Sequence, residues 1–384
     1  MPTIAPGDYR HYKGNHYRVL GTARHSETEE ELVVYRQLYG EFGLWVRPAA
    51  MFVETVTVDG GEQPRFAPLG APYRPRLAAE KRARAQAFID THARPLERAV
   101  YAFHFAGGSA EEVLRELGAF QNDDGGFGHG LEPDLQTPQS SVLATTVALQ
   151  TVRAVNAPAG HPLVRRALSY LVAAHDDEHG YWPIIPADVD DAPHAPWWQS
   201  GAAAPEHAAR YVFNPGAEVV GYLWTYGRQM ALDTRQQLLA QVLAALAARG
   251  GEVEMHELLC LLRLLETPEL PDDVRLHLLA LLRPVVARTV VTDPAGWRGY
   301  GLQPLDVATT PASPFAAAMG DALDLNLLFR MAQQDDEGAW RPAWSWGDSY
   351  VDAWPAARQA WSGVLTVNTL RTLAAFDRLA PRKE

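Results

Sequence analysis

The spacing of hydrophobic residues changes near residue 70. Before that point, β-branched and aromatic residues crowd into four short stretches: "HYRVLGTARHSET", "ELVVYRQLYG", "LWVRP" and "MFVETVTV". Such stretches, separated by turn residues as in "YGEFG" and "VDGGEQP", are typical of four or five short strands. Residues 1–68 are therefore predicted to form a small β domain, either an SH3-like barrel or a curled sheet.

Beyond "APYRPR", apolar residues recur at intervals of three and four, which predicts amphipathic helices. Examples are "RAQAFIDTHARPLERAVYAFHFAG", "SSVLATTVALQTVRAV", "MHELLCLLRLLE" and "GVLTVNTLRTLAAF". Two residue pairs, Thr137-Pro138 and Asn214-Pro215, place a capping residue before a proline and predict helix starts. We predict a linker at residues 69–84 and an all-helical domain at 85–384, so the fold class is mostly α.

The helical part repeats one short pattern, an acidic residue followed by glycine and an aromatic. It occurs in "QNDDGGF", "DDEHGYW", "DPAGW" and "QQDDEGAW", at residues 121–127, 176–182, 293–297 and 333–340. Glycine permits a tight turn, an acid caps a helix, and an aromatic fills the space between helix layers. A unit of roughly fifty residues holds one helix pair with its loops, so five to six pairs fit this length.

These turns resemble the Gln-Trp repeats of squalene and terpene cyclases. "FQNDDGGFGHGLEPDLQTPQSSVLATTVAL" is also similar to the "GGFG" turns of protein prenyltransferase β subunits. The resemblance covers most of residues 85–378 and implies an α/α toroid whose central cavity, in that superfamily, holds isoprenoid substrates. Residues 9–66 resemble a small bacterial domain family of unknown function, through "YRHYKGNHYRVLGTARHSET", "LVVYRQLYG", "LWVRP" and "MFVE".

Composition narrows the classes of partner. The net charge of -12 argues against nucleic acid, because phosphate binding requires concentrated Lys and Arg. A single cysteine, Cys260, allows no internal disulfide, and no apolar run is long enough to span a membrane. We expect a cytoplasmic protein. Nucleophile-elbow, phosphate-loop and dinucleotide-binding motifs do not occur in the sequence.

Several segments combine acidic residues or histidine with aromatics, beside turns or helix starts. In a ring of helix pairs, loops after equivalent helices emerge at the same end, so these segments are expected to converge on a small-molecule ligand in the cavity. The predicted acid/base groups are His129, Glu132, Asp134, His194 and Asp190. The predicted substrate-binding residues are Trp197, Trp198, Glu218, His256, Trp297, Tyr300, Trp346 and Asp348. The alternative is that the carboxylates cap helices and the tryptophans pack between layers.

The resemblance also bears on the role of Asp190 and on metal binding. "DVDD" matches the Asp-x-Asp-Asp motif of class II terpene cyclases, which implies that Asp190 donates a proton, although Pro193 and Pro196 depart from the helix that follows the motif there. Prenyltransferases of the superfamily hold zinc through Asp, Cys and His. His256 and Cys260 share a helix face, but the Asp-x-Cys pairing is absent, so we predict neither a metal nor a cofactor.

Two classes of function remain. The first is an enzyme that acts by acid/base chemistry on an isoprenoid-like or carbohydrate substrate. The second is a non-catalytic ligand-binding or protein-interaction module, in which the β domain recruits a protein partner. The "GHGLEPD" segment, which has no counterpart at the other turns, is the place where the sequence points to function.

Overall fold

The computed structural model describes residues 4–199 and 212–381. These residues fold as two compact units, each assembled from separate stretches of the chain. Of the described residues, unit 1 consists of 4–82, 291–334 and 372–381, and unit 2 of 83–199, 212–290 and 335–371. The predicted boundaries after residue 68 and before residue 85 remain predictions from sequence.

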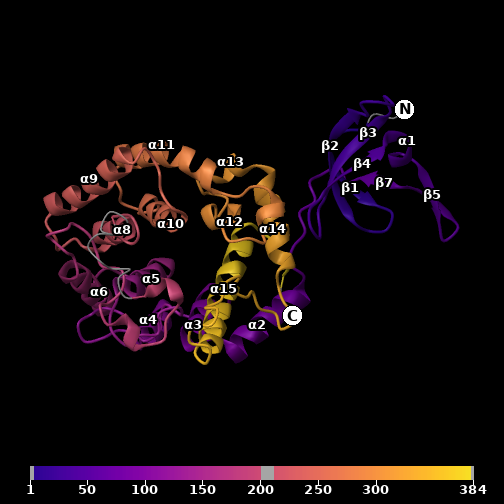
Figure 1. Ribbon diagram of the computed structural model, residues 1–384. Helices are drawn as coiled ribbons and strands as arrows, with labels where there is room; N and C mark the ends of the chain where they lie inside the picture. Colours follow the sequence, from indigo (N-terminus) through magenta and orange to yellow (C-terminus); the bar gives the residue numbers. More distant parts are fainter. Residues whose placement is uncertain (1–3, 200–211, 382–384) are drawn as a thin grey trace. The chain divides into compact units, whose positions relative to one another are not determined.

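Unit 1 begins with an open antiparallel sheet, drawn in indigo and violet in Figure 1. Its strand order is β4-β3-β2-β1-β7, and β5 and β6 form a separate two-stranded hairpin. A β-bulge between Val19 and Gly21 shifts the pairing of β2 with β3. The strand bounds are β1 Gly7–His11, β2 His16–Arg24, β3 Glu31–Gln37, β4 Leu44–Pro48, β5 Thr55–Val58, β6 Gly61–Pro64 and β7 Phe66–Pro68.

The predicted barrel is wrong for the described residues, because β4 and β7 are the two edges of the sheet and do not pair with each other. The stretch "MFVETVTV" was predicted as one strand but divides in two. Met51 and Phe52 end the short helix α1 (Ala49–Phe52), and only Thr55–Val58 is extended. The buried ring of Phe52 stacks on Phe66 at 4.1 Å, so packing against the sheet favours the helical turn.

The later part of unit 1 packs on the β domain. Leu38 and Phe42, in the loop that follows β3, form one buried cluster with Trp297, Leu325 and Phe329. Trp297, Leu325 and Phe329 belong to residues 291–334. This segment holds the 3-10 helix η4 (Pro294–Gly296) and the helices α12 (Pro304–Val307), α13 (Ala316–Met319) and α14 (Asp321–Ala332). The β domain therefore shares a hydrophobic core with residues 291–334.

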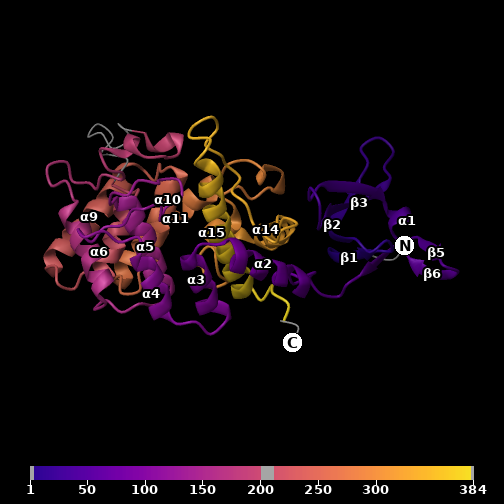
Figure 2. The same ribbon diagram turned by 90° about the horizontal axis from the view of Figure 1, so that it is seen from below.

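Unit 2 is helical, and its helices contact one another in consecutive pairs: α3 with α4, α5 with α6, α8 with α9, and α10 with α11. Helix α8 also contacts α5 and α10, and α9 contacts α11 (Figures 1 and 2). The bounds are α3 Pro95–Phe105, α4 Ala110–Gly118, α5 Val142–Ala154, α6 Pro162–Ala173, α8 Gly216–Tyr226, α9 Leu232–Ala248, α10 Met255–Leu265 and α11 Asp272–Thr289. Two further helices, α2 (Ala79–His92) and α15 (Trp354–Ala375), contribute residues to both units, and the described residues hold fourteen α-helices in all.

Two of the repeated turns make the same hydrogen bonds. The backbone N–H of Phe127 donates to Thr145 Oγ1 at 3.1 Å, and that of Trp340 donates to Thr366 Oγ1 at 3.1 Å. Each threonine hydroxyl in turn donates to the carbonyl four residues earlier in its own helix. All four residues are buried, so each turn is anchored to the helix that follows it.

The same two turns also contact a second helix in the same way. Gln121 donates to the Leu163 carbonyl of α6, and Gln334 donates to the Lys81 carbonyl of α2. Four residues further along, the glycine of each turn has a φ near 93°, and an added Cβ would lie about 2.4–2.5 Å from a carbonyl of that helix. The prediction that these turns are structural units is confirmed for 121–127 and 333–340.

The other turns differ in detail. Gly180 also has a positive φ, whereas Gly296 lies in η4 and has no positive φ. The helix start predicted at Thr137-Pro138 is wrong, because α5 begins at Val142 with Ser141 as its N-cap. At Asn214-Pro215 a helix does begin, since α8 starts at Gly216, but Pro215 occupies the N-cap position and no side chain caps the helix.

Candidate functional site

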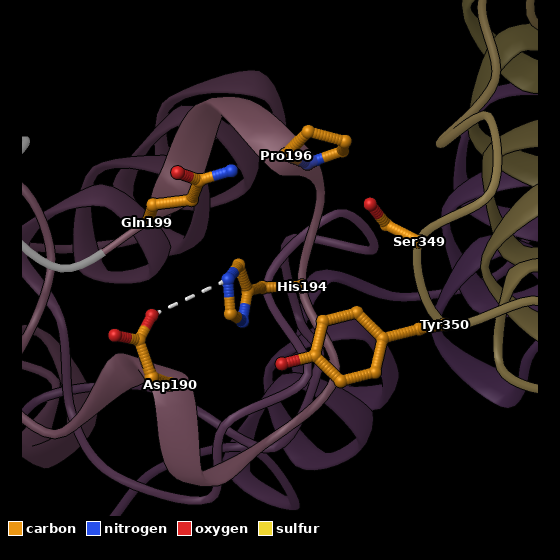
Figure 3. Close-up of a pocket in the computed structure, with 6 residues that line it drawn as sticks. All are labelled: Asp190, His194, Pro196, Gln199, Ser349 and Tyr350. Carbon is orange, nitrogen blue, oxygen red and sulfur yellow. Dashed lines mark ion pairs between the residues drawn. The ribbon is translucent and has the colours of Figure 1, made fainter.

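His194 and Asp190 face one cavity in unit 2. The cavity has a volume of about 290 Å³ and is lined by Asp190, His194, Pro196, Gln199, Ser349 and Tyr350. His194 Nε2 lies 3.5 Å from Asp190 Oδ1, and Figure 3 shows the imidazole between Asp190 and Tyr350. Five of the six lining residues carry polar side chains. The cavity therefore offers hydrogen-bonding groups and little apolar surface.

Short 3-10 helices position this pair. Asp190 lies in η1 (Val189–Asp191), and His194 follows it, directly before η2 (Pro196–Trp198). Prolines 193 and 196 keep the segment from forming a longer helix, so the His194 side chain can turn back toward Asp190. His194 itself is only 4% exposed.

A backbone contact fixes the tautomer of His194. Its Nδ1 lies 2.8 Å from the Ala192 carbonyl oxygen. A carbonyl oxygen only accepts hydrogen bonds, so Nδ1 carries a hydrogen and donates it. In the neutral ring Nε2 then carries the lone pair, and it is the atom beside Asp190.

Asp134 lies behind this cavity and joins its two walls. Its carboxyl oxygens accept the indole N–H groups of Trp346 at 2.7 Å and Trp344 at 3.0 Å. Its backbone carbonyl accepts the N–H of Ala195 at 2.8 Å. Burial raises the pKa of the Asp134 carboxyl, while the indole hydrogen bonds, led by that from Trp346, act to lower it. Asp134 therefore ties the segment of His194 to the segment of Ser349 and Tyr350.

Glu132 is buried beside Asp134. Burial, together with the nearby Asp134 charge, raises the pKa of the Glu132 carboxyl well above its usual range. Its Oε2 has no hydrogen-bond partner among the described residues, which favours the protonated form. Arg94 holds the preceding backbone by donating to the Gly130 and Leu131 carbonyls, and it pairs with Glu97 at 2.7 Å. Neither Glu132 nor Asp134 lines the cavity of His194.

His129 lies at a different cavity. This second cavity, of about 360 Å³, is lined by Arg94, Phe120, His129, Gly130, Pro133, Gln136, Pro138, Ala356 and Ala360. His129 Nε2 contacts Asn122 Oδ1 at 2.8 Å, and the residue has a φ of 55°. Of the five predicted acid/base groups, His194 and Asp190 thus share one cavity. Glu132 and Asp134 are buried, and His129 lies at a second cavity.

The predicted substrate-binding residues also lie in several places. Trp197 is 45% exposed and Trp198 half-buried beside the His194 segment, while Trp346 is buried against Asp134. Asp348 is exposed and does not line the cavity. Trp297 and Tyr300 belong to unit 1, where Trp297 is part of the core and Tyr300 is 72% exposed.

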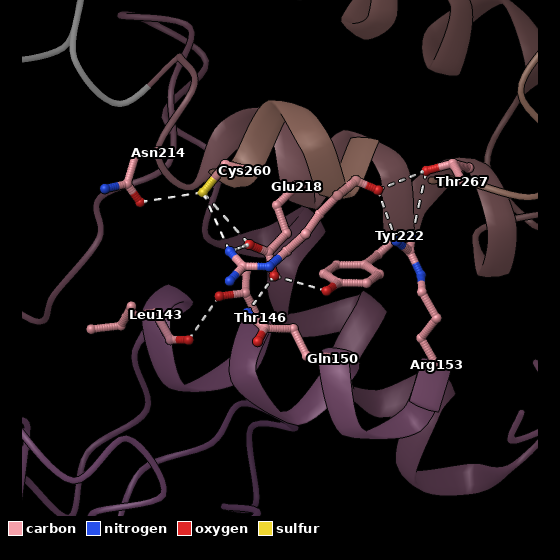
Figure 4. A network of polar contacts seen from close by, with 10 residues as sticks. Leu143, Thr146, Gln150, Arg153, Asn214, Glu218, Tyr222, Cys260 and Thr267 are labelled. Carbon is pink, nitrogen blue, oxygen red and sulfur yellow. Dashed lines mark hydrogen bonds and ion pairs between the residues drawn. The ribbon is translucent and has the colours of Figure 1, made fainter. Parts of the chain in front are cut away.

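Glu218 is the centre of a buried polar network between α5, α8 and α10 (Figure 4). Its carboxylate pairs with Arg263 at 2.8 Å and accepts hydrogen bonds from Tyr222 and Gln150, both at 2.8 Å. The Cys260 thiol lies 3.5 Å from the same carboxylate. These contacts satisfy Glu218 within the protein, so the network holds three helices together.

The pair considered for zinc separates in the structure. His256 pairs with Glu254 at 2.7 Å on the surface, whereas Cys260 is buried. Burial, with the Glu218 charge, raises the pKa of the Cys260 thiol well above its usual value, which disfavours the thiolate that a metal requires. Within residues 4–199 and 212–381, His, Cys, Asp and Glu side chains form no group of three that could hold a metal ion.

Sequence reasoning missed Gln199, Ser349 and Tyr350, which complete the cavity. Tyr350 has a φ of 45°, and its ring lies 5.1 Å from that of His194. The segment "WSWGDSY" did indicate this region, through Trp346 and Asp348. The polar side chains that reach the cavity, however, are those of Ser349 and Tyr350, directly after Asp348. Trp344, the second indole on Asp134, was also missed.

Comparison with known proteins identifies the N-terminal domain. Residues 7–68 match the family described as "Protein of unknown function (DUF1653)". A solved structure of a DUF1653 protein from Bordetella bronchiseptica is 46% identical over 19% of this chain and 94% of that chain, with a TM-score of 0.18. The N-terminal domain of this chain therefore belongs to the DUF1653 family. No curated protein matches the chain. Among the described helices, none combines the length and the apolar character needed to cross a membrane.

Proposed function

We propose that the helical region is an α/α toroid. The equivalence of the two turns supports this. The turn at 121–127 contacts α6 through Leu163, 42 residues after Gln121. The corresponding contact of Gln334 is with Lys81 of α2, 253 residues earlier in the chain. A circular array of helix pairs requires such a contact, in which the last repeat engages a helix of the first.

We further propose that the cavity of His194 and Asp190 binds a small hydroxyl-bearing molecule and exchanges a proton with it. The observation that carries this proposal is the placement of His194 Nε2 at 3.5 Å from Asp190 Oδ1, on the wall of a polar cavity. That distance is long for a direct hydrogen bond. A ligand hydroxyl that bridges the two groups would donate to one and accept from the other.

The chemistry follows from the tautomer. Because Nδ1 donates to the Ala192 carbonyl, neutral His194 presents the lone pair of Nε2 to the cavity and acts as a base. Once it has taken a proton, the imidazolium is stabilised by the Asp190 carboxylate and acts as an acid. Asp190 therefore serves as a charge partner of the histidine, a different role from the terpene-cyclase proton donor implied by resemblance.

The lining favours a polar substrate over an isoprenoid. Asp190, Gln199, Ser349 and Tyr350 supply hydrogen-bond donors and acceptors of the kind that bind sugar hydroxyls, and Trp197 is exposed nearby. An isoprenoid chain would cover these polar groups without offering them hydrogen bonds, whereas a hydroxyl-bearing ligand would replace the water they bind. A monosaccharide or similar polyol is the substrate class that this cavity fits.

A second candidate is ligand binding without turnover. Hydrolysis of a glycosidic bond uses two carboxyl groups that flank the bond. Among the described residues that line the cavity, Asp190 is the one carboxylate, and Asp134 and Glu132 are buried and do not line it. This observation favours proton exchange or binding over glycoside hydrolysis.

Thermal-shift measurements with a panel of monosaccharides and polyols, and with farnesyl diphosphate as the isoprenoid probe, test the proposal. We expect a polyol or sugar to raise the Tm of the wild-type protein, and the shift to be lost in His194→Gln and Asp190→Asn. The matched control is His277→Gln, an exposed histidine of α11. A shift caused only by farnesyl diphosphate, or one that His194→Gln retains, contradicts the proposal. Incubation of the binding ligand with the protein, followed by NMR of the ligand, then separates turnover from binding alone.

A further inference from the structure

The edge strand β4 of the DUF1653 domain exposes three consecutive apolar residues. Leu44, Trp45 and Val46 are 57%, 53% and 60% exposed. Among the described strands, β4 pairs with β3 alone and is one edge of the sheet. Native proteins commonly protect such edges with charges, bulges or covering segments, because an apolar edge invites another strand. Here the exposed apolar side chains coincide with an available backbone edge.

The pairing with β3 shows which backbone groups point outward. Gln37 N–H donates to the Gly43 carbonyl, and Tyr35 is opposite Trp45 in the same register. In an antiparallel pair the hydrogen-bonded positions alternate, so residues 45 and 47 bond to β3. The N–H and C=O of Leu44 and Val46 therefore point away from the sheet, toward an added strand.

We propose that β4 pairs antiparallel with β4 of a second copy of this chain, with the two-fold axis at Val46. This register places Val46 opposite Val46, and each copy donates an N–H to the carbonyl of the other. Leu44 is then opposite Pro48, which has no N–H and whose carbonyl, at the N-cap of α1, accepts the first hydrogen bond of that helix. The two Leu44–Pro48 pairs therefore add no backbone hydrogen bond, and the two bonds between the Val46 residues carry the pairing.

The same register creates a favourable side-chain pair. Trp45 is opposite Arg47 of the second copy at a non-hydrogen-bonded position, where side chains approach most closely. An indole face and a guanidinium attract each other. Arg47 already lies 5.8 Å from the Phe66 ring and contacts the Tyr35 hydroxyl, so its side chain extends over the same face of the sheet as Trp45. Since the axis repeats every contact, the pair forms twice.

This self-complementarity is the reason to assign the edge to a second copy. A two-fold axis requires that one surface complement itself, and the sequence "LWVRP" does so with apolar residues at its centre and the Trp/Arg pair around them. Because five residues on each side bury a small area, the dimer belongs to the weak, concentration-dependent class.

Sedimentation velocity of the full chain over a wide range of concentration tests this proposal. We expect a monomer–dimer equilibrium in the wild-type protein. Val46→Lys places two like charges opposite each other, and Trp45→Ala removes an exposed side chain with little risk to folding. Each is expected to weaken the dimer by about tenfold or more. The matched control is Leu20→Lys, an exposed apolar residue of β2 away from the edge, which should leave the equilibrium unchanged.

Circular dichroism and the Tm confirm that the variants are folded. A protein that is monomeric at every concentration overturns the proposal. A dimer that persists in both Val46→Lys and Trp45→Ala, or one that only Leu20→Lys disrupts, also overturns it, because the copies would then associate through another surface. Binding of an unrelated extended peptide at β4 without self-association would assign the edge to a different partner.

Discussion

The carboxyl group of Asp134 accepts the indole N–H of Trp346 at 2.7 Å, across 212 residues of sequence. This bond joins the loop after the first repeat turn to the segment that precedes α15. Since the Asp134 carbonyl also accepts the N–H of Ala195, one residue holds both walls of the His194 cavity. Asp134 is a positioning residue for the candidate site, because it does not line the cavity itself.

Asp134→Asn is expected to destabilise unit 2. An asparagine side chain has one acceptor oxygen, so one of the two indole N–H groups that contact Asp134 would lose its acceptor. The expected cost is about 1–3 kcal/mol in the free energy of unfolding. Urea denaturation measures it, with the exposed Asp348→Asn as control. Equal stability of both variants would show that the indole bonds contribute nothing.

The two equivalent threonines provide a test of the repeat. Thr145→Val and Thr366→Val each remove the acceptor of a buried backbone N–H while keeping the side-chain shape. We expect similar losses of about 1–3 kcal/mol in each variant, measured by chemical denaturation. Thr91→Val, in which the hydroxyl is exposed, serves as the control. A large effect at one threonine and none at the other would argue against equivalent turns.

Gly125→Ala is expected to be strongly destabilising. The residue has a φ of 93°, and an added Cβ would lie 2.4 Å from the Arg166 carbonyl oxygen. Strained backbone of this kind costs about 1–3 kcal/mol, before the steric overlap is counted. Gly160→Ala is the matched control, since its Cβ would meet no atom within 4 Å. If the Tm values of the two variants are the same, the turn does not have the described geometry.

The buried Glu132 makes stability depend on pH. Because its pKa is raised in the folded state, the protonated form is favoured there, and stability falls as the pH rises from the unfolded pKa through the folded one. Glu132→Gln lacks this titration. We expect the Tm of Glu132→Gln to exceed that of the wild type by a margin that grows from mildly acid to mildly alkaline pH. Glu178→Gln, at an exposed glutamate, is the control, and a Tm difference between Glu132→Gln and the wild type that stays constant with pH would contradict the burial.

Cys260 is expected to react slowly with thiol reagents. Its side chain is buried within the Glu218 network, and its raised pKa keeps the thiol protonated at neutral pH. Labelling by a disulfide reagent should therefore be slow in the native protein and rapid in urea, followed by absorbance. Rapid labelling of the native protein would contradict the burial of Cys260, on α10, against Glu218 of α8.

Much of the fold was predictable because it depends on local spacing. The three- and four-residue period of "MHELLCLLRLLE" predicted α10, and the β-branched stretch "ELVVYRQLYG" predicted β3. Repeat turns could be found because glycine and aromatic residues are needed at fixed positions. The helix start at Thr137-Pro138 failed, because this pair precedes a turn, and Ser141 caps α5 instead.

The candidate site was harder to predict, since it depends on the direction of side chains after folding. His194 and Asp190 meet because the prolines around them produce short 3-10 helices, which no periodicity shows. Glu132 and His129, three residues apart, face a buried interior and a separate cavity. The contribution of Tyr350 comes from far along the chain, so it could not be derived from spacing.

Nitrogen NMR of the protein with ¹⁵N-labelled histidine shows directly which His194 nitrogen carries the hydrogen. We expect neutral His194 to carry it on Nδ1, with Nε2 unprotonated. The Nε2 signal should shift when the sugar or polyol that raises the Tm is added, and His194→Gln identifies the resonance. A neutral His194 protonated on Nε2, or an Nε2 signal that does not respond to that ligand, would contradict the claim that this nitrogen exchanges a proton within the cavity.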